Sequence, residues 1–367
     1  MQKVLQTGLS AGMSATEGLH SSKPNPVDPS FNGLESLLPE GFIPKKTTQV
    51  ILRCKEGEIR APCMNIGGWS WGDTATWHWK PEELPGLKEA WKMLYESGIN
   101  WIDTAQAYGS GESERICGDL VEGLPRDSFV MQTKWYVVPN VENILSPTHA
   151  PTKMLKDSLE RMRLDFVDVY LVHGHIHASS LSQVAKGLAE CVELGLTRAV
   201  GVANYDEDDM IKLADELSKY GIPLATNQCE FSVLRRHPEV HGLIKACRER
   251  GIVFQSYSSV AQGRLTDKYT VENPPPSSHR FSSYDMKDIE GTKQVLSSIA
   301  QEHGVSTAAV ALNYNIIKGA VPTVGVRNVK QVQENLRAFE WRLSNDEIKT
   351  IDSVSLEGKK TALWQQG

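Results

Sequence analysis

The stretch GINWIDTAQAYGSGESE, residues 98–114, decides how this chain folds. Within it an apolar run ends on Asp103, and Tyr108 follows before a glycine-rich turn. A second apolar run, FVMQTK, ends on Lys134. A buried strand that ends on a charged group is costly unless that charge finds a partner. The two strands therefore predict a site where a carboxylate, an ammonium and a phenol meet, and where the pKa of the phenol is lowered so that it can donate a proton near neutral pH.

Short apolar runs alternate with amphipathic helical patterns from residue 46 onward. A hairpin is expected first, with strands at Gln49–Arg53 and from Ile59, around a turn at residues 56–58. Eight strand candidates follow, at 64–68, 100–103, 129–134, 167–173, 199–204, 225–231, 253–258 and 321–325. Helical patterns lie between them at 87–97, 152–162, 181–194, 208–220 and 238–250, and glycines that suit left-handed C-caps follow at Gly98, Gly195, Gly221 and Gly251. Eight βα units close as a barrel, so we expect an α/β fold: a single-domain (β/α)8 TIM barrel with an N-terminal β-hairpin.

A doubly wound open sheet is the other fold that such an alternation could give. It would usually carry a dinucleotide fingerprint after its first strand. The turn Gly109-Ser110-Gly111 does lie between a strand and a helix, but the third glycine of the fingerprint falls at Glu114, which would block close packing of the helix. We interpret the turn as a tight loop, with Glu112 and Glu114 in the first turn of the next helix.

Composition excludes several classes of protein. The chain has 367 residues, 40% of them hydrophobic, and a formal net charge of −6, so it has no general attraction to nucleic acid or to an anionic membrane. Its apolar runs are too short to span a bilayer. The six cysteines are dispersed without a CxxC pair, which is typical of reduced thiols in the cytoplasm. We expect a cytoplasmic monomer or weak homo-oligomer.

Three regions are expected along the chain. Residues 1–45 are rich in Ser, Gly and Pro and lack the apolar core of a secretory signal, so they predict a flexible N-terminal extension, with an organelle address as the alternative. Residues 46–343 would form the barrel, and residues 344–367 a C-terminal helix and tail. The Pro- and Ser-rich segment 266–287 lacks periodicity and is expected to be a mobile flap. The tail, with Trp364, is expected either to cap the pocket or to stay loose.

Polar residues end the second to seventh predicted barrel strands. In a barrel of this kind the active site forms at the C-terminal ends of the strands. Any one of these side chains could be a satisfied structural group, but together they predict a single site at the barrel mouth. They are Asp103, Lys134, His173, Asn204, Gln228 and Ser258.

Seven motifs in register resemble the aldo-keto reductase superfamily, in particular its pyridoxal-reductase-like and channel-subunit-like branch. They span about residues 46–350 and read GINWIDTAQAYGSGESE, FVMQTK, LDFVDVYLVH, AVGVANY, ATNQCEFS, SYSSVAQGRLTDKY and VPTVGVRNVKQVQENL. The resemblance implies reversible, NADPH-dependent reduction of an aldehyde or ketone. Tyr108 would donate the proton, Lys134 paired with Asp103 would favour its ionised form, and His173 would orient the carbonyl.

The resemblance also implies how the cofactor would bind. Asn204 and Gln228 would hold the nicotinamide carboxamide, the ring would stack on Tyr257, and Arg327 would bind the adenosine 2′-phosphate. The pyrophosphate would lie along Ser258, Val260, Gln262, Gly263, Arg264 and Leu265, and the adenosine against Gln331, Glu334 and Asn335. The chain departs from the family pattern at Ala203, Ser259 and Gly174-His175, which leaves the shape of the local pocket open.

Two alternatives accompany this prediction. His173 and His175 form an HxH pair that could chelate zinc, but the later strands end without histidine, so no metal is expected and His175 is expected in the substrate pocket. The fold could also serve a cofactor-binding regulatory subunit with little turnover. The substrate pocket is expected to be aromatic, with Trp69, Trp71 and Trp135 in its wall and with Trp77 and Trp79 in ordinary packing.

Overall fold

A closed barrel forms the centre of the computed structural model, which describes residues 23–28, 30–31, 38–137, 141–177, 179–279, 281–361 and 367. In these residues eight parallel strands pair in the order β10-β3-β4-β5-β6-β7-β8-β9. Their bounds are β3 Asn65–Gly67, β4 Trp101–Asp103, β5 Val130–Trp135, β6 Val167–Val172, β7 Thr197–Ala203, β8 Leu224–Glu230, β9 Val253–Tyr257 and β10 Val321–Gly325. Each predicted strand coincides with an observed one to within two residues at either end, and the (β/α)8 barrel is confirmed.

The predicted hairpin is present and closes the N-terminal end of the barrel. Its strands are β1 (Gln49–Arg53) and β2 (Glu58–Pro62), paired antiparallel. Leu52 and Ile59 are buried in one apolar cluster with Trp101 and Val130, which are the first residues of β4 and β5. Because this end is filled with side chains, only the C-terminal end of the barrel is open to a ligand.

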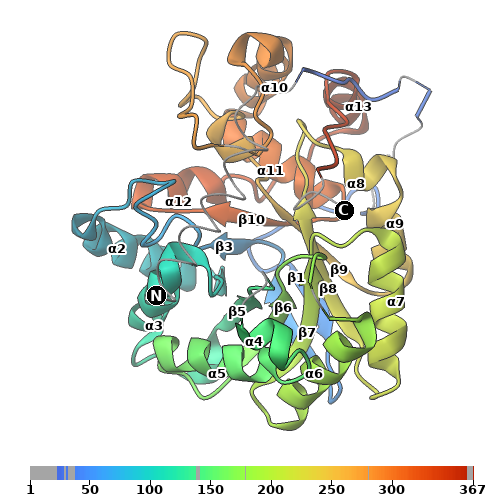
Figure 1. Cartoon of the computed structure of the whole chain (residues 1–367). Coiled ribbons are helices and arrows are strands. Elements are labelled where there is room, and N and C mark those ends of the chain that lie inside the picture. The colour runs from blue at the N-terminus through green and yellow to red at the C-terminus, as the bar shows by residue number, and fades with distance from the viewer. Residues whose placement is uncertain are drawn as a thin grey trace.

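Helices surround the strands (Figure 1). Their bounds are α2 Leu84–Glu96, α3 Glu112–Val121, α4 Val141–Leu145, α5 Ala150–Met162, α6 Leu181–Glu193, α7 Glu207–Ser218, α8 His237–Val240, α9 Leu243–Glu249, α10 Glu290–His303, α11 Thr307–Ile317, α12 Val329–Leu336 and α13 Asn345–Ser353. The four glycines expected to end helices have φ between +64° and +83°, as left-handed C-caps require. The helix expected at 238–250 is instead two, α8 and α9, because Gly242 between them is left-handed with φ +80°.

Two segments far apart in the sequence lie side by side on the barrel. Pro26 forms an isolated bridge with Leu356, and the Asn25 side chain donates to the Gly358 carbonyl at 2.8 Å and accepts from its N–H at 3.2 Å. These contacts tie residues 23–28 to the segment that follows α13. The limits of the three regions stay predictions, and Trp364 lies outside the described residues. No helix in the described part of the chain is long and apolar enough to cross a membrane.

Candidate active site

A cavity of about 1430 Å³ opens at the C-terminal ends of the barrel strands. It runs from Tyr108 and His173, near β4 and β6, to Glu334 and Asn335 on α12. Ligand pockets for drug-sized molecules are typically about 300–1,000 Å³, so this cavity can hold a dinucleotide together with a small substrate.

Asp103, Lys134 and Tyr108 meet at one end of the cavity. Lys134 on β5 is fully buried, and its Nζ lies 2.7 Å from the carboxylate of Asp103, the last residue of β4. The same Nζ lies 3.3 Å from the Tyr108 hydroxyl and donates to the Thr104 carbonyl at 3.0 Å. Tyr108 begins a short 3-10 helix, η2 (Tyr108–Gly111), which β4 reaches through the four residues 104–107. The charge pairing predicted from the two strand ends is therefore present.

The net shift in the pKa of Tyr108 is opposite to the expected one. Burial raises this pKa, and the neighbouring Lys134 ammonium lowers it only in part. Burial acts against the charge of Lys134 as well, but the Asp103 carboxylate and the Tyr108 hydroxyl outweigh it and raise the lysine pKa. At neutral pH the pair is thus a protonated phenol beside a stable ammonium ion.

His173 follows β6 and faces the same end of the cavity. Its ring centroid lies 5.5 Å from that of Tyr108, and its backbone carbonyl accepts from the Asn204 side chain at 3.1 Å. Burial, helped by the Lys134 charge, lowers the pKa of His173 well below its ordinary value. The imidazole is therefore neutral and presents both a donor and an acceptor.

A buried amide network beneath Asp103 was missed by the sequence interpretation. Gln132 on β5 donates to the Asp103 carboxylate at 2.5 Å, and it exchanges two hydrogen bonds of 3.0 Å with Gln255 on β9. Gln255 also accepts from Asn65 at 2.9 Å and from Gln228 at 3.0 Å. Because strand residues two apart share a face, the spacing of Gln132 to Lys134 could have indicated this layer.

The glycine-rich turn has a steric cause. Gly109 is left-handed, with φ +54°, and a Cβ on it would lie 2.8 Å from the backbone of Gly72. Only glycine allows this close approach of η2 to the loop that follows β3.

The first turn of α3 carries Glu112 and Glu114, as expected. Glu114 is buried and paired with Arg161 at 2.6 Å, so it stabilises packing and does not contact the cavity.

Most of the residues expected to bind a cofactor line the cavity. Asn204 has φ +64°, and its side-chain oxygen accepts from the Tyr257 hydroxyl at 2.8 Å. The others on the cavity wall are Gln228, Ser258, Val260, Gln262, Gly263, Arg327, Gln331, Glu334 and Asn335.

Two of the expected cofactor residues do not reach the cavity. Leu265 is fully buried in the core. Arg264 is 4% exposed, and its guanidinium donates to the carbonyls of His279 at 2.9 Å and of Phe281 and Tyr284 at 3.4 Å. Burial lowers the pKa of Arg264 to about 10. This arginine anchors the segment 279–284 rather than a pyrophosphate.

Arg327 is held by a carboxylate that the sequence interpretation did not consider. Its guanidinium forms a two-pronged ion pair with Glu83, the last residue of η1 (Pro81–Glu83), with Nε 2.7 Å from one oxygen. It also donates to the Trp77 carbonyl at 3.0 Å. Arg327 and Glu83 both line the cavity, so a phosphate arriving there would compete with this carboxylate.

The aromatic wall differs from the expected one. Trp69 lines the cavity as expected, with its ring 6.2 Å from that of Tyr108. Trp71 and Trp135 do not, because both are buried and donate their indole N–H into the core, to Val326 and Asn143. His175 is also absent from the lining. The wall is completed by Tyr136, Phe281 and Trp77, the last of which was expected to be ordinary packing.

The segment 266–287 reaches across the cavity. The Phe281 ring lies 5.7 Å from Trp69 on one side and 5.3 Å from Tyr257 on the other, measured between centroids. The Ser278 hydroxyl donates to the Thr76 carbonyl at 3.1 Å, and the His279 ring lies 4.5 Å from Trp77. These contacts connect the segment after β9 to the loop after β3, above the cavity.

Comparison with known proteins identifies the family. Residues 64–356 match the model of the Aldo/keto reductase family. The chain belongs to this family. It is 32% identical to the chloroplastic pyridoxal reductase of Arabidopsis thaliana over 329 residues, covering 85% of this chain and 88% of that protein. It is 28% identical to the NADH-specific methylglyoxal reductase of Escherichia coli, over 78% of this chain and 93% of that protein.

Solved aldo-keto reductases share the fold. A thermostable aldo-keto reductase crystallised with epalrestat superposes with a TM-score of 0.67 at 25% identity, covering 83% of this chain and all of that one. An aldo-keto reductase of Bombyx mori in complex with NADP has a TM-score of 0.65 at 21% identity, over 85% of this chain and 95% of that one. The relatives named here are reductases, and this protein is an NAD(P)-dependent oxidoreductase of the same family.

Proposed function

We propose that this protein reduces an aldehyde to the alcohol, reversibly, with NADPH as the cofactor and Tyr108 as the proton donor. The observation that carries the proposal is the Tyr108 hydroxyl at the cavity wall, 3.3 Å from the Lys134 ammonium that Asp103 holds in place. The relatives support the cofactor, since some of their structures contain NADP or NADPH.

The cavity residues fit a nicotinamide dinucleotide. Asn204 and Gln228 offer amides where a carboxamide would bind, and Tyr257 lies on the cavity wall beside them. At the far end, α12 offers Glu334 and Asn335 to the adenosine. When bound, the cofactor supplies the hydride. Asn204 and Gln228 would hold its nicotinamide toward the end of the cavity where Tyr108 lies.

Tyr108 would give its proton to the carbonyl oxygen of the substrate. Because burial raises the pKa of Tyr108, the phenol carries its proton at neutral pH before the reaction. The Lys134 ammonium then stabilises the phenolate that the transfer leaves behind. The neutral His173 can donate an N–H to the same carbonyl oxygen and so fix its orientation.

The substrate we propose is an aromatic aldehyde of the pyridoxal type. The wall around Tyr108 is formed by rings from three different loops, Trp69, Tyr136 and Phe281. Flat rings are bound well between such aromatic faces. The similarity to a pyridoxal reductase points the same way.

Turnover distinguishes this enzyme from a regulatory subunit of the same fold. The purified protein should oxidise NADPH when pyridoxal or 4-nitrobenzaldehyde is added, measured as loss of nicotinamide absorbance. A panel of aromatic and aliphatic aldehydes, including methylglyoxal, tests the substrate class. Tight binding of NADPH without reduction of any aldehyde in the panel would refute the enzyme and favour the regulatory alternative.

A further inference from the structure

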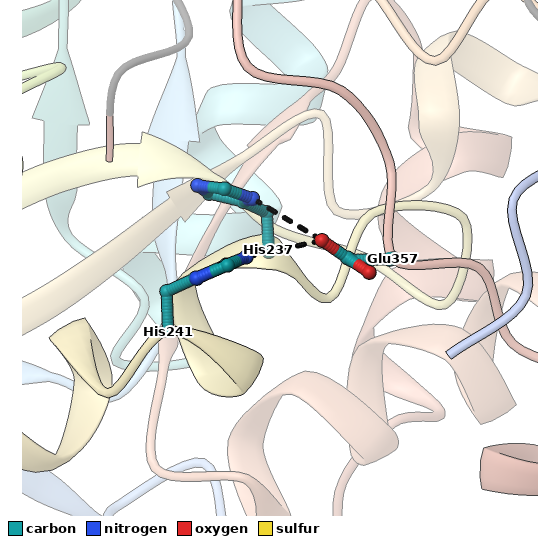
Figure 2. A group of neighbouring side chains, drawn as sticks. All are labelled: His237, His241 and Glu357. Atoms are coloured by element: carbon teal, nitrogen blue, oxygen red, sulfur yellow. Dashed lines mark hydrogen bonds and ion pairs between the residues drawn. The ribbon is translucent and has the colours of Figure 1, made fainter. Parts of the chain in front are cut away.

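Two histidines and a glutamate come together outside the active-site cavity (Figure 2). His237 and His241 belong to α8 and the residue after it, and Glu357 follows α13. His241 Nε2 lies 3.0 Å and His237 Nδ1 3.9 Å from the same oxygen of Glu357. One ligand atom from each of the three lies within 4.8 Å of the others. It is the one such group of three or more in the described residues.

We propose that His237, His241 and Glu357 bind a divalent cation of the zinc type. Two imidazoles and one carboxylate are a donor set that suits Zn²⁺ far better than Mg²⁺ or Ca²⁺, which prefer oxygen ligands alone. Histidines four positions apart present their rings on the same side of a helical turn. The ring centroids are 4.0 Å apart, and one nitrogen of each ring is directed at the Glu357 carboxylate (Figure 2).

The distances require only small movements. Ligand atoms at about 2.0–2.2 Å from a tetrahedral zinc are about 3.3 Å from one another. The two distances to Glu357, 3.0 and 3.9 Å, lie on either side of that value. His241 and Glu357 have side chains 53% and 31% exposed, which leaves room for water in the fourth position. Because these side chains are partly exposed, they have room to rotate toward a shared ion.

The group carries one negative charge, that of Glu357. Two positive charges lie near the site, and each has an acidic partner of its own: Arg235 pairs with Glu230, and Lys360 pairs with Asp206 at 3.3 Å. Within the described residues, Glu357 has only the two histidines as ion-pair partners.

The cation would fasten the segment after α13 to the barrel. Leu356 N–H donates to the Val233 carbonyl at 2.9 Å, and Glu357 N–H donates to the Asn25 carbonyl at 2.9 Å. A metal between α8 and Glu357 would add a side-chain link to these backbone bonds. Its role would be structural, because none of its three ligands lines the active-site cavity.

Metal binding to the purified full chain tests the proposal without any use of activity. Metal-free protein is titrated with Co²⁺, whose visible absorption is strong in a tetrahedral site, and Zn²⁺ affinity is measured by competition with a chromophoric chelator. We expect one ion per chain without a thiolate charge-transfer band. His241→Gln and Glu357→Gln should each weaken binding by more than about tenfold, and Zn²⁺ should raise the melting temperature of the wild type more than that of either variant.

His303→Gln is the matched control, because His303 forms a similar exposed pair with Glu347 elsewhere on the surface. It should bind Zn²⁺ like the wild type. Far-ultraviolet circular dichroism checks that the variants fold. If His241→Gln does not fold, Glu357→Gln tests the site in its place. Absence of a bound ion, thiolate ligation at a cysteine, or equal affinity in all variants would overturn the proposal.

Discussion

Tyr108 is subject to two opposing influences on its pKa. Burial favours the neutral phenol, and the Lys134 ammonium favours the phenolate. The balance leaves a proton on the hydroxyl and a compensating charge 3.3 Å away. A group in this state can release its proton to an acceptor that carries developing negative charge.

Removing the hydroxyl tests this role. Tyr108→Phe should lower kcat by about 10²–10⁴-fold, the usual contribution of a positioned proton donor, because no other hydroxyl lies beside Lys134 among its described contacts. NADPH affinity, measured by quenching of tryptophan fluorescence, should stay within about twofold, since the ring that packs against Trp69 is retained. Near-wild-type turnover would remove Tyr108 from the mechanism.

Glu83 and Arg327 form a second pair of opposite charges, at the far side of the cavity. The carboxylate holds the guanidinium that the family resemblance assigns to the 2′-phosphate. A phosphate dianion would have to displace Glu83 or bind close to its negative charge. If Arg327 binds the 2′-phosphate as proposed, the pair would oppose NADPH more than NADH, which lacks that phosphate.

Glu83→Gln should tighten NADPH binding about fivefold, which corresponds to about 1 kcal/mol for a partly exposed ion pair. NADH affinity should change less. Dissociation constants for both cofactors from fluorescence titration measure the difference, and Glu82→Gln, an exposed neighbour, is the control. Weaker NADPH binding in Glu83→Gln would mean that the carboxylate orients Arg327 for the phosphate instead of competing with it.

At the scale of elements, the segment 266–287 connects two loops above the cavity. Arg264 holds residues 279–284 by their backbone carbonyls, and Phe281 lies between Trp69 and Tyr257. A dinucleotide entering the cavity must pass beneath this segment or displace it. We therefore retain the mobile flap as a prediction.

Trypsin cleavage at the exposed Lys268 reports on the flap. Saturating NADPH should slow this cleavage severalfold, because a bound cofactor adds contacts beneath the segment. Arg264→Gln should speed it, since the backbone of residues 279–284 loses its anchor. Cleavage after Lys219, exposed at the end of α7, should not respond. Equal cleavage at Lys268 with and without NADPH would argue against a cofactor-linked flap.

The elements of the barrel were predictable from sequence, and the side chains inside its mouth were less so. Strand positions follow from apolar runs, and helix ends follow from glycines such as Gly98 and Gly195. Trp71 follows β3 and Trp135 ends β5, but the sequence does not indicate that their side chains are buried in the core. Glu83 was invisible because nothing in the local pattern links it to Arg327, 244 residues further along.

At the scale of the whole molecule, buried neutral histidines link stability to pH. Burial lowers the pKa of His279 to about 4, with Arg264 and Lys268 adding to the effect, and lowers that of His173 well below 6.5. The unfolded chain binds protons at these histidines below pH 6.5, whereas the folded protein does not. Their contribution to stability is therefore complete above pH 6.5 and is lost as the pH falls toward 4.

The free energy of unfolding should drop by about 1–3 kcal/mol between pH 7 and pH 5, since a pKa difference of one unit corresponds to about 1.4 kcal/mol. Urea unfolding followed by circular dichroism at several pH values measures it. In His279→Gln the free energy of unfolding should depend less steeply on pH over the same pH range, because glutamine does not titrate. A urea midpoint that is constant from pH 7 to pH 5 would contradict the prediction.

The location and the oligomeric state of the whole protein stay predictions. Two observations bear on the cellular location: the similarity to a chloroplastic enzyme and the composition of residues 1–45. Most of residues 1–45 lie outside the described part of the chain. The closed barrel and the family could be predicted from the sequence because seven motifs occur in register. Contacts between copies of the chain leave no comparable pattern in the sequence.

The barrel can close only late in the synthesis of the chain. β3 pairs with β10, so residues 65–67 meet residues 323–325 only after nearly the whole chain has left the ribosome. Until then one edge of the growing sheet has no partner, and such edges invite association with other chains. The three-residue length of β3 offers very little edge to an intruding strand. A short first strand thus limits the unpaired edge that the growing sheet exposes at β3.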